Sequence, residues 1–107
     1  MTWTDQHQRT EIVHTVLARA AIDPADPGLF AGLPELDRLF GGIDGLLRAL
    51  DYRWNNHLHA KLEQAEFEGN TAVEAYLELA AEQPALRAIL DTHRPVGRTI
   101  RSHVLAR

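Results

Sequence analysis

Histidine is the residue type in this chain that is best suited to chemistry. Six His occur among the 107 residues and Cys is absent, so disulfides, cysteine nucleophiles and thiolate metal sites are excluded. His59 and Glu63 have the i,i+4 spacing of one ligand pair in a helical-bundle metal site, to which His14, His93 or His103 could add ligands. His59 and Glu63 nevertheless fall opposite the apolar face of their helix. We therefore expect a solvated ion pair there, with no metal or cofactor, and keep a metal-binding bundle as an alternative.

His57 and Lys61 fall at or near the apolar side of the same segment, where an unpaired charge would be costly. We expect His57 to be hydrogen-bonded at the edge of the core and Lys61 to extend its amine to that edge. Coverage by another chain is the alternative, and it would make the interface sensitive to pH.

A row of arginines near the C-terminus is the second group. Residues 1–83 carry six basic and fourteen acidic side chains, net −8, whereas residues 84–107 carry five Arg and one Asp, net +4. Such a row could bind the phosphates of nucleic acid or another anionic partner. We favour pairing with acidic helices of the same protein. On a continuous helix these side chains would lie within an arc of about 60° around the helix axis. The row comprises Arg87, Arg94, Arg98 and Arg101.

Motifs of enzymes are absent from the sequence. The glycines at 41, 42 and 45 follow a short helix and lack the lysine of a phosphate-binding loop, and Ser102, the only serine, has no nucleophile elbow around it. We therefore expect no enzymatic activity.

The residues 43–68 must position most of these groups. Their apolar residues recur three or four positions apart, which predicts one amphipathic helix about 40 Å long. Glycine commonly ends a helix in the left-handed conformation, so we expect this helix to end at Gly69. The apolar stripe consists of Ile43, Leu46, Leu47, Leu50, Trp54, Leu58, Leu62 and Ala65.

The fold expected for residues 1–107 is a single all-α domain, a small bundle of four main helices and a short accessory helix. Length allows only one core. The main helices are expected at 5–21, 43–68, 72–82 and 84–106, and the accessory helix at 34–40.

Local signals support these boundaries. Thr4 is a candidate N-cap with Trp3 packing back on the first turn, and Pro34 suits the first turn of the accessory helix. Thr71 and Glu74 form a capping-box pattern, the strongest such signal in the chain. Pro95 either kinks the last helix or begins a new one.

Two further apolar groups have expected positions. Leu29, Phe30 and Leu33, within a loop too rich in Pro and Gly for a helix, are expected to cover one end of the bundle. The inward face of the helix at 72–82 is expected to consist of Val73, Tyr76, Leu77 and Ala80.

The function we expect is that of a non-catalytic interaction module that forms a homodimer, with the long helix and the C-terminal helix supplying the shared surface. The long helix extends beyond the reach of its 11-residue neighbour, and exposed apolar side chains of that size usually mark a partner surface. No segment is apolar enough for a membrane span, and the start lacks a secretion signal, so a cytoplasmic protein is expected. Ten Arg against one Lys suggests a bacterial origin. The expected surface comprises Trp54, His57, Leu58, Lys61 and Leu62.

Overall fold

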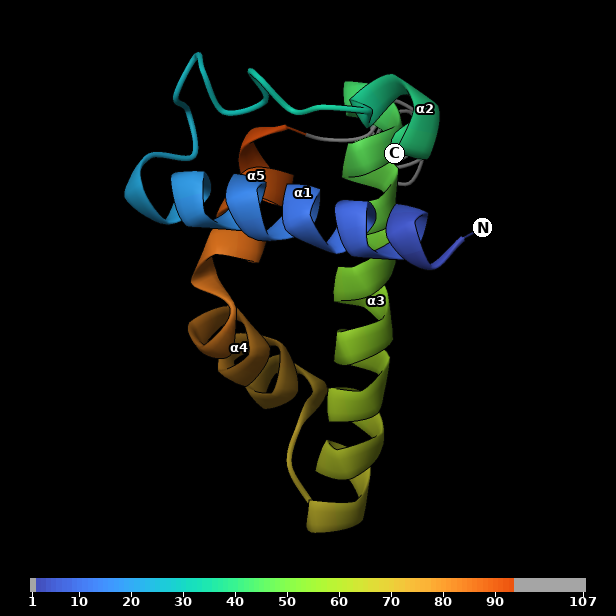
Figure 1. Cartoon of the computed structure of the whole chain (residues 1–107). Coiled ribbons are helices and arrows are strands. Elements are labelled where there is room, and N and C mark those ends of the chain that lie inside the picture. Colours follow the sequence, from blue (N-terminus) through green and yellow to red (C-terminus); the bar gives the residue numbers. More distant parts are fainter. Residues whose placement is uncertain (1, 94–107) are drawn as a thin grey trace, which may run out of the picture.

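The computed structural model describes residues 2–93, which form five helices and no strand (Figure 1). This confirms the predicted all-α fold of a small helical bundle. Within the described residues no helix is both long and apolar enough to cross a lipid bilayer. The helices are α1 (Trp3–Ile22), α2 (Leu36–Phe40), α3 (Ile43–Glu68), α4 (Ala72–Glu82) and α5 (Pro84–Thr92).

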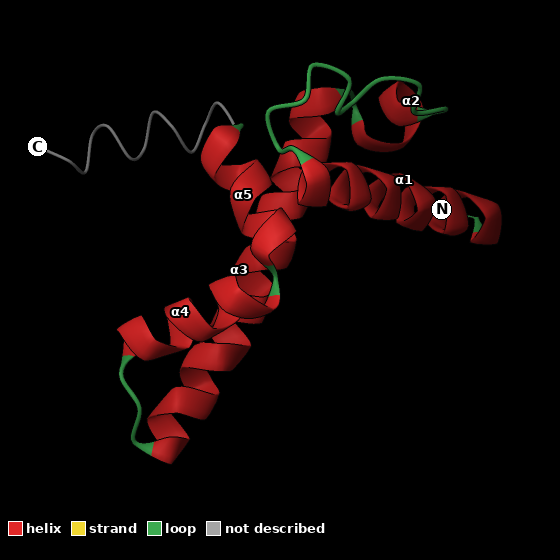
Figure 2. Cartoon of the chain, turned by 90° about the vertical axis from the view of Figure 1, so that its left-hand side faces the viewer, coloured by secondary structure: helices red, strands yellow, loops and turns green. Residues whose placement is uncertain are grey.

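The helices α2, α4 and α5 pack against the long helix α3, whereas α1 packs chiefly against α5 (Figure 2). Near its start, α1 crosses it and α2 and α5 pack beside it, whereas α4 folds back along its second half. Both predicted ends of α3 are confirmed. Gly69 has a φ of 81°, and its amide donates to the carbonyls of Ala65 and Glu66, so the chain leaves the helix there.

The core lies where α1, α3, α5 and the start of the chain's long loop meet. Leu29 from that loop is fully buried, and Phe30 and Leu33 pack against the same cluster, which confirms that the loop covers the core. Arg19 of α1 holds the loop in place, since its Nη1 lies 2.7–3.2 Å from three loop carbonyls. The buried residues of this core cluster are Ile12, Val16, Ala20, Leu29, Leu46, Leu47, Leu50, Trp54, Leu79, Leu86, Ile89 and Leu90.

The start of α1 differs from the prediction. Thr2, not Thr4, is the N-cap, because the Thr2 hydroxyl accepts a hydrogen bond from the Asp5 amide at 3.0 Å. Trp3 is therefore the first residue of the helix and is 83% exposed. Its ring stacks on His7 and does not pack back as a staple, so that prediction is wrong.

The accessory helix begins two residues later than predicted, at Leu36. Glu35 precedes it with a left-handed φ of 67°, so Pro34 belongs to the turn before the helix. After α2, Gly41 and Gly42 adopt φ values of 78° and 97°, which confirms the sharp bend into α3. Gly45 then lies so close to Phe40 that an added Cβ would be 1.5 Å from the Phe40 carbonyl oxygen. Close packing of α2 on α3 therefore requires glycine at position 45.

The last described helix ends earlier than predicted. α5 stops at Thr92, and His93 has φ −127° and ψ 85°, which are not helical values. The prediction of an uninterrupted helix from residue 84 toward Pro95 is therefore wrong. Residues 94–106 of the predicted helix lie outside the described part of the chain.

Candidate functional site

The surface predicted on α3 is covered largely by the protein itself. Trp54 is only 1% exposed, because Tyr76 of α4 meets its ring edge-on at 5.7 Å and the Arg87 guanidinium lies 4.6 Å above it. Leu58 packs against the core and Leu62 is half-buried. The prediction of Trp54 as an exposed partner residue is wrong, because α4 reaches back far enough to cover it.

His57 and Lys61 are also engaged within the chain. His57 Nδ1 lies 2.7 Å from Gln83 Nε2, which confirms a hydrogen-bonded histidine at the core edge. The Lys61 amine lies 2.6 Å from Glu78 and 2.7 Å from Glu82, so it is paired with carboxylates of α4. Hydrogen bonding to Glu78 and then Glu82 holds the pKa of Lys61 above its ordinary value.

The helix α4 has a second apolar face that turns away from α3, which we call the outer face of α4. Val73 and Leu77 are 67% and 60% exposed, and Tyr76, at the border of the face, is 38% exposed. The exposed Ala81 continues the face toward the end of the helix, and Ala80 lies at its border, half-buried against the core. The prediction that Val73 and Leu77 turn inward is therefore wrong, whereas Tyr76 contacts Trp54 and Ala80 packs against the core, as predicted.

Small residues determine which face of α4 turns inward. Ala75 of α4 and Ala65 of α3 are both buried, and such side chains let two helix backbones approach closely. Leu79, 1% exposed, joins the core from the same face of α4. The sequence allowed either face, because apolar residues occur at helical spacing on both. Two signals could have shown which face of α4 turns toward α3. They are the pair of alanines, Ala65 and Ala75, and the placing of Lys61 opposite Glu78 and Glu82.

The N-terminus of α4 follows the predicted capping box. The Thr71 hydroxyl accepts from the Glu74 amide at 3.1 Å, and the Glu74 carboxylate accepts from the Thr71 amide at 2.8 Å. These hydrogen bonds to Thr71 hold the pKa of the Glu74 carboxyl below its ordinary value.

The predicted arginine row is described only at Arg87. Its guanidinium forms an ion pair with Asp91 of α5 at 2.9 Å in addition to covering Trp54. Arg94, Arg98 and Arg101 lie outside the described residues. Pairing of the row with acidic helices therefore stays a prediction, and two acidic residues of α4, Glu78 and Glu82, bind Lys61.

The histidines do not assemble a metal site within residues 2–93. His59 Nε2 lies 3.4 Å from Glu63 Oε1, and both side chains are more than 70% exposed, which confirms a solvated pair. No group of three or more metal-ligating side chains occurs in the described chain. His93 instead hydrogen-bonds the Pro24 carbonyl at 3.0 Å and meets the Phe30 ring edge-on.

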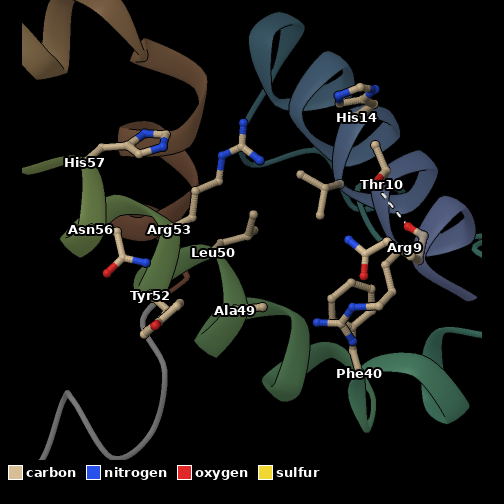
Figure 3. Close-up of a pocket in the computed structure, with 12 residues that line it drawn as sticks. Arg9, Thr10, His14, Phe40, Ala49, Leu50, Tyr52, Arg53, Asn56 and His57 are labelled. Atoms are coloured by element: carbon tan, nitrogen blue, oxygen red, sulfur yellow. Dashed lines mark hydrogen bonds between the residues drawn. The ribbon is translucent and has the colours of Figure 1, made fainter. Parts of the chain in front are cut away.

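A groove of about 280 Å³, which the sequence did not predict, lies between α1 and α3 (Figure 3). Figure 3 shows Ala49 and Leu50 of α3 between Arg53 and the pair formed by Arg9 and Phe40. Acidic residues are absent from its lining, although the whole chain has 15. The lining consists of Gln6, Arg9, Thr10, Val13, His14, Phe40, Ala49, Leu50, Tyr52, Arg53, Asn56 and His57.

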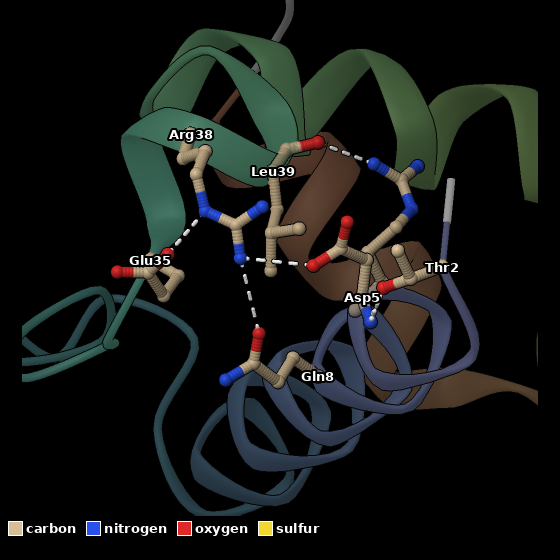
Figure 4. Close-up of polar contacts among 7 residues, drawn as sticks. Thr2, Asp5, Gln8, Glu35, Arg38 and Leu39 are labelled. Atoms are coloured by element: carbon tan, nitrogen blue, oxygen red, sulfur yellow. Dashed lines mark hydrogen bonds and ion pairs between the residues drawn. The ribbon is translucent and has the colours of Figure 1, made fainter.

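One end of the groove is held by contacts between α2 and α1 (Figure 4). Arg38 of α2 lies 3.0 Å from the Asp5 carboxylate and 3.3 Å from the Gln8 amide oxygen, and it also pairs with Glu35. The hydrogen bond from Arg38 holds the pKa of Asp5 below its ordinary value. Arg9 adds a hydrogen bond to the carbonyl of Leu39. These contacts place Phe40 under the Arg9 guanidinium, 4.2 Å from the ring centroid.

Comparison with known proteins leaves both surfaces to be interpreted from their own geometry. No protein-family model matches the chain, and neither a curated protein nor a solved structure matches it.

Proposed function

We propose that this chain is a non-catalytic helical interaction module that forms a homodimer through the outer face of α4. The observation that carries the proposal is the exposure of Val73 and Leu77, 67% and 60%, on a helix that is already packed on its opposite face. Apolar side chains clustered on one side of a helix are typical of partner surfaces.

A second copy fits this face because the face is self-complementary. In an antiparallel pair related by a twofold axis near residues 76 and 77, Val73 of each copy lies opposite Ala80 of the other. The large side chain then meets the small one, and Leu77 lies beside Tyr76 at the centre.

Charges beside the outer face are compatible with this pairing. Glu78 and Glu82 lie on the side of α4 that is turned toward α3, where Lys61 of the same chain binds both. Glu74 is engaged in the capping box. Repulsion between the acidic sides of two copies is therefore reduced within each copy before they meet.

The dimer is expected to be weak. One 11-residue helix per copy offers less area than the roughly 800 Å² per partner of a standard interface. We expect a dissociation constant of about 10–100 µM, equivalent to roughly 5–7 kcal/mol. A cytoplasmic location and a bacterial origin stay predictions from composition.

Sedimentation equilibrium between low and high micromolar concentrations tests the proposal. The wild type should pass from monomer to dimer, and Leu77→Glu should stay monomeric while keeping its helical circular dichroism. Ile22→Glu is the matched control, since Ile22 is 89% exposed at the end of α1 and should dimerise like the wild type. A wild-type monomer throughout this range, or equal loss in both variants, would overturn the proposed interface.

A further inference from the structure

We propose that the groove between α1 and α3 binds a small organic oxyanion, a phosphate monoester or carboxylate attached to an apolar body. This surface is separate from the outer face of α4, so the inference does not depend on the dimer.

Unpaired positive charge is the first observation that supports this ligand class. Each described arginine or lysine outside the groove has oxygen acceptors: Arg19 binds loop carbonyls, and the others bind carboxylates.

 Within residues 2–93 there are five such side chains, those of Arg19, Arg38, Arg48, Lys61 and Arg87.

Arg9 and Arg53, the two arginines of the groove, differ from those five. Arg9 contacts only the Leu39 carbonyl and the Phe40 ring, and so has no carboxylate partner among the described residues. Arg53 is exposed and has no hydrogen-bond or ion-pair partner within the described part of the chain. In a protein whose formal net charge is −4, the groove thus keeps two guanidinium groups available to an anion.

The other lining residues indicate what the anion should be attached to. Val13, Phe40 and Ala49 supply apolar surface, which a bare inorganic ion could not use. Neutral hydrogen-bonding side chains, those of Gln6, Thr10, Tyr52 and Asn56, complete the lining. A volume of about 280 Å³ suits a small molecule with one ring or a short chain.

Titration calorimetry and amide chemical shifts with four probes test the inference. Phenyl phosphate and benzoate distinguish the two sources of the oxyanion, benzyl alcohol is the neutral analogue, and inorganic phosphate lacks the apolar body. We expect millimolar or tighter binding of phenyl phosphate or benzoate, at least tenfold tighter than benzyl alcohol, with shifts at the groove. Binding should weaken as salt concentration rises. Failure of both oxyanions to bind at millimolar concentration, or equal binding of benzyl alcohol, overturns the proposal, and equal binding of inorganic phosphate overturns the apolar part of it.

Two arginines on the same helix provide the variant and its control. Arg53→Gln should weaken binding at least fivefold, whereas Arg48→Gln should change it less than twofold, because Arg48 pairs with Asp44 and does not line the groove. Arg53 is exposed, so its replacement should leave the fold intact. Equal weakening in the two variants would indicate general charge attraction and would overturn the site.

Discussion

The two halves of α3 are stabilised in different ways. Its core end, residues 43–57, buries Leu46, Leu47, Leu50 and Trp54 among α1, α4 and α5. Its hairpin end, residues 58–68, fully buries only Ala65 and otherwise relies on half-buried leucines and the ion pairs of Lys61. One helix can therefore join a well-packed region to a thinly packed one, and the thinly packed one carries the outer face of α4.

The largest expected effect comes from removing the main side chain of the core end. Trp54→Ala should lower the free energy of unfolding by about 3–5 kcal/mol, since it leaves a cavity beneath Tyr76 and Arg87. Leu62→Ala is the matched change at the hairpin end and should cost about 1–2 kcal/mol, because Leu62 is only half-buried. Urea unfolding measures both, and equal losses would contradict the difference between the two ends.

An intermediate effect is expected at the capping box that starts α4. Thr71→Ala should cost about 1 kcal/mol, because the amide of Glu74 loses its acceptor. Amide hydrogen exchange should show the increase mainly in α4 and little change in α1. Thr10→Ala is the control, since the Thr10 hydroxyl donates only to the Gln6 carbonyl within α1. A uniform increase across all helices would mean that α4 does not open separately.

The smallest effect concerns pH. The pKa of Glu74 is lowered in the folded protein, so its contribution to stability is present above the ordinary value of 4.5 and is lost as pH falls through the lowered value. The difference in melting temperature between the wild type and Glu74→Gln should therefore shrink below about pH 4.5. Glu66→Gln should show no such trend, because its exposed carboxylate accepts no hydrogen bond in the described chain. The same trend in both variants would contradict the assignment.

The sequence predicted those parts of the fold that depend on local backbone chemistry. Gly69 and the Thr71–Glu74 box set the end of α3 and the start of α4 as expected, because both signals act within one turn of helix. Thr2 was missed as the N-cap of α1, although Thr4 is the same residue type two positions later.

The candidate surfaces could not be predicted in the same way, because they depend on contacts between helices. Val73 and Leu77 have the spacing of a buried stripe, but Ala75 and Leu79 occupy the side toward α3. Arg9 and Arg53 are 44 positions apart, and only the crossing of α1 over α3 brings their side chains to one groove. Periodicity identifies the faces of a single helix, whereas the neighbour of each face is determined by the tertiary fold.

The burial of Trp54 has a spectroscopic consequence. The chain has two tryptophans, of which Trp3 is 83% exposed and Trp54 is 1% exposed. In a Trp3→Phe background all indole fluorescence would come from Trp54, whose ring is covered by side chains of α4 and α5. Opening of α4 would bring water to that ring, shift its emission to longer wavelength and expose it to acrylamide quenching. The protein thus contains its own optical reporter of whether the hairpin formed by α3 and α4 is closed.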